Sequence, residues 1–123
     1  MRGLNEYIIV DESRQDNLRP TSKKELEKLI KRRIKEQGPN CDLNDIDVSK
    51  ITDMSYLFED SNFKGDISKW DVSNVKDMGS MFKYSNFKGN LDKWNVSNIV
   101  DKTWIFYRSP LDGREPRWWG SKD

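Results

Sequence analysis

The chain contains no histidine and only one cysteine, and these two scarcities restrict its chemistry. Without histidine it lacks the most common general base and the most common metal ligand of proteins. Cys41 has no second cysteine for a disulfide within the chain, which suits a reducing compartment, and we interpret it as a small buried residue. We therefore expect a protein that is not an enzyme and that needs no metal or other cofactor.

Long apolar runs are also missing. The run from Tyr7 to Val10 is too short for the apolar segment of a signal peptide, and no cleavage site of small residues follows it. Nothing approaches the roughly 20 apolar residues of a membrane span. We therefore expect a cytoplasmic protein that does not bind a membrane, with the cell surface as the alternative location.

An excess of one charge is absent as well, because 22 basic residues face 21 acidic ones, a net charge of +1. This balance gives no general attraction to nucleic acid or to an anionic membrane. Charged residues make up 35% of the chain, which could signal disorder, but five Trp, five Phe and four Tyr argue against it. The 123 residues fit one structural domain with a modest core.

What the chain does contain is an internal repeat. Residues 42–65, 66–89 and 90–113 align without a gap, and the first two copies share half of their positions. The shared apolar positions are Leu43/Ile67/Leu91, Ile46/Trp70/Trp94, Val48/Val72/Val96, Ile51/Val75/Ile99, Leu57/Met81/Ile105, Phe58/Phe82/Phe106 and Phe63/Phe87/Leu111. One copy cannot close a core alone, but stacked copies form continuous apolar columns. We therefore predict an α/β repeat fold, a short solenoid of three coils.

Local patterns divide each coil. The alternation from Trp70 to Ser73 is typical of a short strand. Asp53, Asp77 and Asp101 each precede an apolar cluster, so we expect them to cap one or two helical turns over 54–59 and 78–83. Their recurrence favours turn chemistry over a carboxylate pair for catalysis or a metal ladder. Gly65, Gly89 and Gly113 end the coils, where we expect a positive φ.

The flanks are suited to cover the ends of the stack. Residues 1–41 contain a predicted strand over 7–10, a polar linker over 11–19 and an amphipathic helix over 23–37. Ser22 and Glu25 have capping-box spacing, and Gly38 followed by Pro39 ends the helix. Residues 114–123 form a Trp-rich C-terminal cap in this interpretation.

The stretch from Phe63 to Met78, with the following Met81 and Phe82, resembles the BspA-type leucine-rich-repeat family. That repeat is common in mycoplasma and gut-bacterial proteins of unknown function. The resemblance covers about 41–113 and implies a leucine-rich-repeat-like solenoid that acts by binding. Members are usually described as surface or adhesion-like proteins.

We predict a non-enzymatic protein-binding module whose partner is another protein, acting as a monomer or weak homo-oligomer. The candidate partner-binding residues are Lys24, Lys28, Lys31, Arg32, Arg33, Lys35, Lys69, Lys93, Arg114, Arg117, Trp118 and Trp119. The alternative interpretations make the helix cations a complement to the acidic first repeat and the tryptophans a cover for the last one.

Three other functions remain open at this point. One is a phage- or mobile-element-encoded inhibitor of a host defence nuclease, similar to an anti-CRISPR protein. Another is a bacterial surface or adhesion protein. The third is nucleic-acid binding through the basic helix, which lacks the aromatic residues that usually stack on bases.

Overall fold

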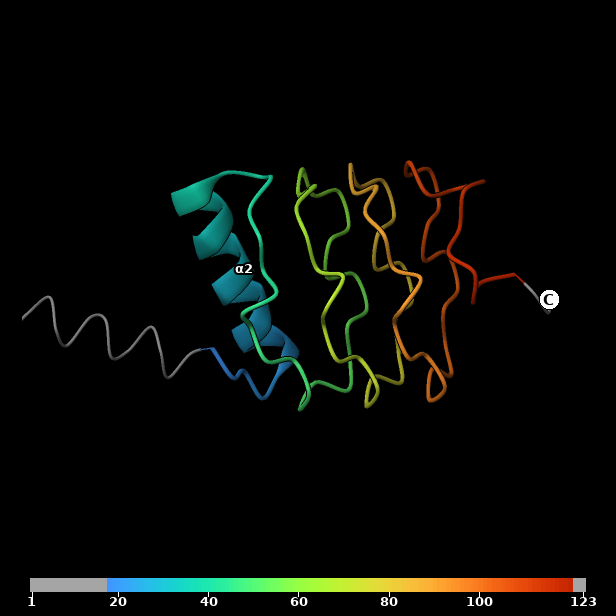
Figure 1. Cartoon of the computed structure of the whole chain (residues 1–123), viewed down its shortest axis with the longest axis horizontal. Helices are drawn as coiled ribbons and strands as arrows, with labels where there is room; N and C mark the ends of the chain where they lie inside the picture. The colour runs from blue at the N-terminus through green and yellow to red at the C-terminus, as the bar shows by residue number, and fades with distance from the viewer. Residues whose placement is uncertain (1–17, 121–123) are drawn as a thin grey trace, which may run out of the picture.

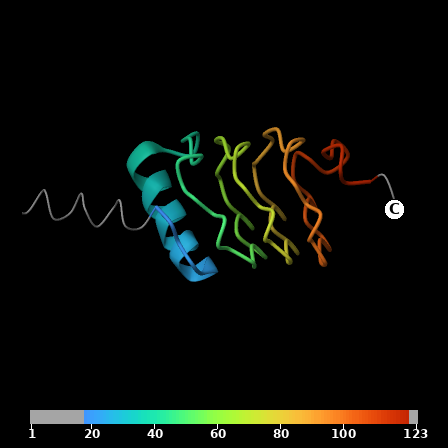
Figure 2. The same ribbon diagram turned by 60° about the horizontal axis from the view of Figure 1, so that its bottom comes forward.

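The computed structural model describes residues 18–120, in which one helix covers one end of a stack of three repeats (Figures 1 and 2). The helix, α2, spans Lys23–Gln37, and repeats 1, 2 and 3 (residues 42–65, 66–89 and 90–113) follow in order away from it. The strand predicted over 7–10 and most of the predicted linker lie outside the described residues.

The predicted helix is confirmed, and its ends form as the sequence indicates. Ser22 is the N-cap, and its hydroxyl accepts a hydrogen bond from the Glu25 backbone N–H. The Glu25 carboxylate accepts from the Thr21 N–H at 2.8 Å, one residue earlier than a capping box requires. Gly38 ends the helix with a φ of 91°, a conformation that suits glycine. Leu26, Leu29 and Ile30 are buried.

The predicted α/β repeat class, a three-coil solenoid of leucine-rich-repeat type, is wrong. Residues 18–120 contain one helix and no sheet, and their only β pairing is three isolated parallel bridges: Asp42 with Asp66, Asp53 with Asp77, and Asp77 with Asp101. Neither the strand near Trp70 nor the helical turns over 54–59 and 78–83 form. Each repeat is instead a series of hydrogen-bonded turns.

Alternation of the backbone donors explains why turns replace the helical segments predicted over 54–59 and 78–83. In repeat 1 the N–H groups of residues 57, 59 and 61 donate to carbonyls three residues earlier, within the repeat. Those of residues 54, 56, 58 and 60 donate to carbonyls 23 residues later, in repeat 2. Repeat 2 bonds to repeat 3 in the same way. Half of the donors thus close turns while the other half join repeats, so neither a helix nor a ladder can propagate.

Acidic and amide side chains close the turns at three positions in every repeat. At each position the side-chain oxygen accepts a hydrogen bond from the backbone N–H two residues on. The nine residues are Asp42, Asp66 and Asn90; Asp47, Asp71 and Asn95; and Asp53, Asp77 and Asp101. This confirms that the repeated aspartates serve turn chemistry.

Equivalent apolar residues stack in columns through the molecule. Phe58 and Phe82 lie 5.6 Å apart between ring centroids and are inclined by 5°, and Phe82 and Phe106 lie 5.8 Å apart. The indole N–H of Trp70 donates to the carbonyl of Leu43 in the preceding repeat. The columns expected from the sequence are buried, apart from partly exposed positions in repeat 3.

At two of the repeat ends, the structure requires glycine for a reason other than the expected positive φ. Gly65 and Gly89 do not have a positive φ. A Cβ at Gly65 would collide with the carbonyl oxygen of Cys41, and one at Gly89 would lie 2.6 Å from the Phe87 ring. Close packing therefore requires glycine there, whereas Gly113, with a φ of 93°, does meet the expectation.

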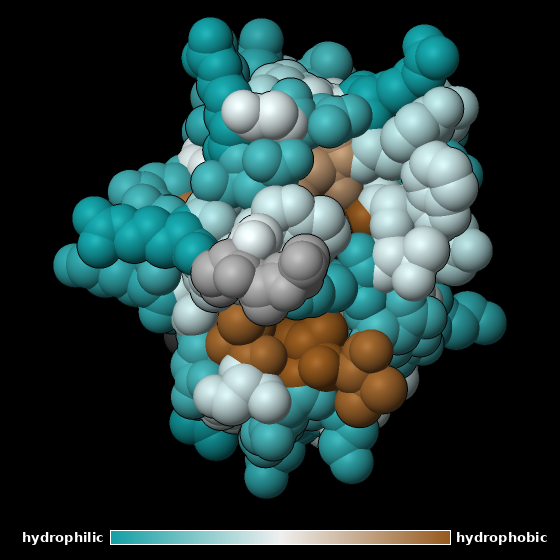
Figure 3. Space-filling view, turned by 90° about the vertical axis from the view of Figure 1, so that its right-hand side faces the viewer, coloured by the Kyte–Doolittle hydropathy of each residue, from teal (hydrophilic) through white to brown (hydrophobic). Residues whose placement is uncertain are grey.

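The end of the stack beyond repeat 3 is only partly covered. Figure 3 looks on to this end and shows apolar side chains gathered on part of it. Val96 and Ile99, whose equivalents are buried in the earlier repeats, are partly exposed here, and Val100 is 84% exposed. In the described residues no helix is long and apolar enough to cross a membrane.

Candidate functional site

The predicted basic residues of α2 divide into an exposed group and one structural residue. The exposed residues are Lys24, Lys28, Lys31, Arg32 and Lys35. Arg33 instead turns towards repeat 1, where its guanidinium donates to both carboxylate oxygens of Asp45 at 2.9 and 3.1 Å. These hydrogen bonds raise the pKa of Arg33. Arg33 therefore fastens the helix to the stack.

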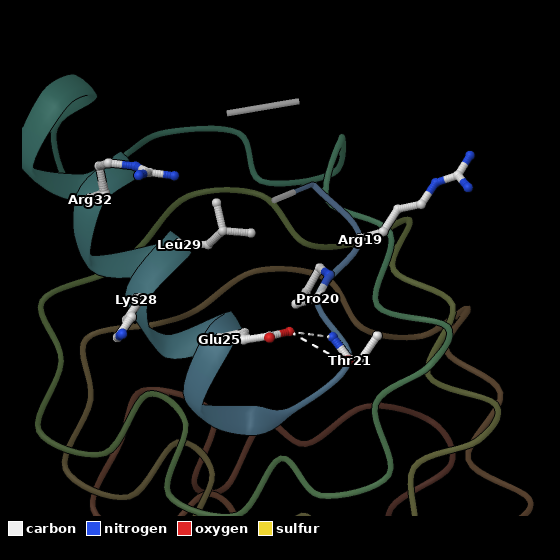
Figure 4. A pocket seen from close by; sticks show the side chains of 7 residues that line it. All are labelled: Arg19, Pro20, Thr21, Glu25, Lys28, Leu29 and Arg32. Atoms are coloured by element: carbon white, nitrogen blue, oxygen red, sulfur yellow. Dashed lines mark hydrogen bonds between the residues drawn. The ribbon is translucent and has the colours of Figure 1, made fainter. Parts of the chain in front are cut away.

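A hollow of about 460 Å³ lies beside the helix (Figure 4). Lys28, Leu29 and Arg32 line it from α2, and Arg19 and Pro20 line it from the preceding segment. Its single carboxylate, that of Glu25, accepts hydrogen bonds from the Thr21 N–H and hydroxyl, which lower the pKa of Glu25. This hollow is open and basic.

The other predicted residues belong to the repeats and to the C-terminal segment, which lies at the end of the stack opposite α2 (Figure 1). Lys69 and Lys93 are exposed at the same position of neighbouring repeats. Arg114 is exposed, and Arg117 is exposed beside Asp92 with a nitrogen–oxygen distance of 3.8 Å. The structure therefore does not gather the predicted residues into one site.

The two C-terminal tryptophans pack on repeat 3. The indole N–H of Trp118 donates to the carbonyl of Leu91 at 2.8 Å. The indole N–H groups of Trp94 and Trp70 donate in the same way to the carbonyls of Ile67 and Leu43. Trp119 lies edge-on to Phe106 at 5.6 Å. This geometry supports a covering role, and Trp118 continues the tryptophan column of the repeats.

Aromatic residues outside the predicted set form an exposed cluster, which we call the aromatic face: Tyr56, Tyr84, Trp104 and Tyr107. Tyr56 is 53% exposed, Tyr84 46% and Trp104 54%. Tyr107 lies edge-on to Trp104 at 4.5 Å and to Tyr84 at 5.6 Å. Most other large apolar side chains of the described residues are buried, so this face stands out.

Two of these rings occupy a left-handed position in the turns. Tyr56, Ser80 and Trp104 occupy the same position of successive repeats and have φ values of 61°, 57° and 62°. A left-handed conformation at a residue with a Cβ costs roughly 1–2 kcal/mol. The sequence carried a signal for this column, because Trp104 replaces Ser80 in the repeat alignment, but the alignment alone does not show exposure.

Cations on the aromatic face are already paired. Lys23 lies 5.9 Å from the centroid of the Tyr56 ring and 3.8 Å from a carboxylate oxygen of Asp53. Lys83 lies 5.6 Å from the Tyr84 ring centroid, 6.0 Å from the Trp104 ring centroid and 3.9 Å from the Glu59 carboxylate. Their charges are therefore largely compensated within the protein.

A hollow of about 290 Å³ opens between Tyr56 and Trp104. Gly79 and Ser80 of the intervening repeat form part of its lining, and Asp77 and Asp101 also contribute. Among residues 18–120 these two aspartates have no ion-pair partner within 4.0 Å, unlike Asp53. The Thr103 backbone N–H and hydroxyl lower the pKa of Asp101, which keeps it charged at neutral pH.

Other reactive groups are scarce in the described residues. Cys41 is buried, and burial raises the pKa of its thiol. Within residues 18–120 no group of three Cys, Asp or Glu side chains is arranged to hold a metal ion. The aromatic face and its hollow are therefore the most distinctive surface of residues 18–120.

A family model matches residues 25–118, which extend from α2 through all three repeats to Trp118. No curated protein and no solved structure matches the chain. The matched range includes the aromatic face and the hollow between Tyr56 and Trp104. The chain therefore belongs to the family described as Mycoplasma protein of unknown function, DUF285.

Proposed function

We propose that the protein is a non-catalytic module that binds another protein through its aromatic face. The observation that carries this proposal is the exposure of Tyr56, Tyr84 and Trp104 on a chain whose other large apolar groups are mostly buried. Aromatic side chains are enriched at the energetic centres of protein interfaces. The backbone beneath them is held by hydrogen bonds between repeats, so binding needs little ordering of the surface.

The sequence relationship supports the same proposal. We further propose that the repeat shares ancestry with the BspA-type repeats, whose members act through binding. The residues from Phe63 to Met78 that carry the resemblance support that relationship.

Affinity capture with matched variants tests the proposed surface. The wild-type protein, immobilised, is compared with a Tyr84→Ala/Trp104→Ala variant and with two controls, Lys28→Ala/Arg32→Ala on α2 and Arg114→Ala/Arg117→Ala in the C-terminal segment. We expect a protein captured by the wild type and both controls to be lost by the aromatic variant. If the aromatic variant still captures this protein and either control variant does not, the binding surface lies at the residues changed in that control and not on the aromatic face.

A further inference from the structure

We propose that the hollow between Tyr56 and Trp104 binds the cationic side chain of a basic segment of the partner, with arginine preferred to lysine. This inference rests on the proposed function and names the chemistry that the aromatic face recognises. Two rings form its walls, small residues contribute to its base, and two carboxylates supply its charge.

The two walls leave room for a planar group to enter the hollow. Tyr56 and Trp104 are two repeats apart, and the side chain between them is only that of Ser80. Phenylalanine rings of successive repeats lie 5.6 and 5.8 Å apart, so the wall positions are separated by roughly 10 Å. A flat group in contact with a ring on each side needs about 7–8 Å. The walls are farther apart than this, so a guanidinium in the hollow would stack on one of the two rings and not on both.

The carboxylates converge on the same point. A Cβ built on Gly79 would lie 3.2 Å from a carboxylate oxygen of Asp77 and 3.5 Å from one of Asp101. The equivalent positions of repeats 1 and 3 carry Ser55 and Thr103, so repeat 2 alone has no side chain at this position. A guanidinium has enough N–H donors to reach both carboxylates, whereas an ammonium offers a point charge.

Charge selects the occupant. Lys23 and Lys83 lie 5.9 and 6.0 Å from the ring centroids of Tyr56 and Trp104, and they are also paired with Asp53 and Glu59. Among residues 18–120, Asp77 and Asp101 are the carboxylates lining the hollow that have no ion-pair partner within 4.0 Å. A neutral aromatic occupant would desolvate both carboxylates without compensation. A nucleic acid could stack its bases on the rings, but its phosphates would meet these two negative charges. A basic protein segment is therefore favoured over a nucleic-acid strand.

Nuclear magnetic resonance with defined probes tests the inference on the whole protein. The probes are the blocked tripeptides acetyl-Gly-Arg-Gly-amide, acetyl-Gly-Lys-Gly-amide and acetyl-Gly-Gln-Gly-amide, and the DNA oligomer dT8. The readout is the indole N–H signal of Trp104, assigned by its loss in Trp104→Phe. We expect saturable shifts with the arginine probe, weaker binding of the lysine probe and no shift with the glutamine probe.

Two variants separate the roles of charge and space. Asp77→Asn/Asp101→Asn removes both charges but keeps the turns, because Asn90 and Asn95 close equivalent turns in this chain. We expect it to weaken arginine binding at least about tenfold. Ser80→Tyr fills the hollow at a position whose φ tolerates Tyr56 and Trp104 in the other repeats, and we expect it to abolish binding. Asp66→Asn/Asp71→Asn is the matched control and should bind normally.

The outcomes also separate this inference from the proposed function. Unchanged indole signals of Trp70 and Trp94 show that each variant is folded, because both donate to carbonyls of the stack. If no cationic probe shifts Trp104 while the aromatic variant still loses its captured protein, the cation site is wrong and the binding face stands. If only dT8 shifts Trp104, both proposals are overturned. Equal binding by the Asp77→Asn/Asp101→Asn variant would overturn the role of the carboxylates.

Discussion

At the scale of single residues, one small device builds most of this molecule. An aspartate or asparagine oxygen accepts the N–H two residues on at three positions in each repeat. Side-chain acceptors of this kind compete with helix and sheet for backbone donors. They therefore explain both the regularity of the turns and the lack of a sheet in residues 18–120.

The Asp71 side chain offers a direct measure of this device. Its carboxylate accepts from both the N–H and the hydroxyl of Ser73. We expect Asp71→Ala to lower the free energy of unfolding by about 1 kcal/mol, since the turn loses its acceptor. Asp71→Asn keeps an acceptor and should cost less, as Asn95 occupies this position in repeat 3. Urea denaturation followed by circular dichroism measures both, and equal costs would contradict the role of the acceptor.

Acid should weaken the same turns. Hydrogen bonds from Ser49, Ser68 and Ser73 lower the pKa values of Asp47, Asp66 and Asp71, respectively. A carboxyl whose pKa is lower in the folded state stabilises the fold above its unfolded pKa, and that contribution is lost as pH falls.

We therefore expect the free energy of unfolding to stay level near neutral pH and to decrease from about pH 5 downwards. Urea titrations at a series of pH values measure this dependence. The Asp47→Asn/Asp66→Asn/Asp71→Asn variant should show a shallower decrease, and an identical slope would assign the acid sensitivity to other groups.

At the scale of elements, α2 is the part that the sequence predicted best. Its apolar stripe, its Ser22 cap and its Gly38 end all act within one helix, where spacing in sequence translates directly into position in space. The strand predicted near Trp70 does not form, because the Trp70 N–H and the Asp71 carboxylate close turns there. The helical turns predicted over 54–59 and 78–83 do not form, because alternate donors close turns within a repeat and join it to the next repeat. No local pattern distinguishes these two uses of the backbone.

The candidate site was harder to predict than the helix. The sequence analysis predicted basic residues and tryptophans as partner-binding, but Arg33 and Trp118 form hydrogen bonds within the protein. The aromatic face combines residues of all three repeats, and the hollow depends on the small residue between Tyr56 and Trp104. These properties follow from the stacking of repeats, so they become visible only in three dimensions.

Docking of α2 on the stack can be tested through Leu26, which is fully buried. We expect Leu26→Ala to lower the free energy of unfolding by about 2–5 kcal/mol, because it leaves a cavity between helix and repeat 1. Chemical denaturation followed by circular dichroism measures the loss. The exposed Lys24→Ala is the control and should change it by less than about 0.5 kcal/mol. Similar values for the two variants would show that the helix is not packed as described.

At the scale of the whole molecule, the repeats depend on one another. Phe82 of repeat 2 is fully buried and stacks on Phe58 of repeat 1 and on Phe106 of repeat 3, so its side chain links all three repeats. We expect Phe82→Ala to cost about 3–5 kcal/mol and to leave one cooperative transition. Tryptophan fluorescence and circular dichroism should give coincident unfolding curves for the wild-type protein and for the Phe82→Ala variant.

The exposed end supplies the control for that experiment. Val100 is 84% exposed, so Val100→Ser should change the free energy of unfolding by no more than about 0.5 kcal/mol. Separate fluorescence and circular dichroism transitions, in either protein, would show that the repeats unfold independently.

The division of backbone donors between two directions also restricts how such a gene can change in length. A donor in one repeat meets its acceptor 23 residues later, so a duplication that copies repeat 2 as a whole supplies every new donor with an acceptor. An insertion of a few residues in the turns over 54–61 would instead leave a row of donors out of register. The open reading frame can therefore grow or shrink by recombination in whole-repeat steps, with α2 and the Trp118 segment carried unchanged at the two ends.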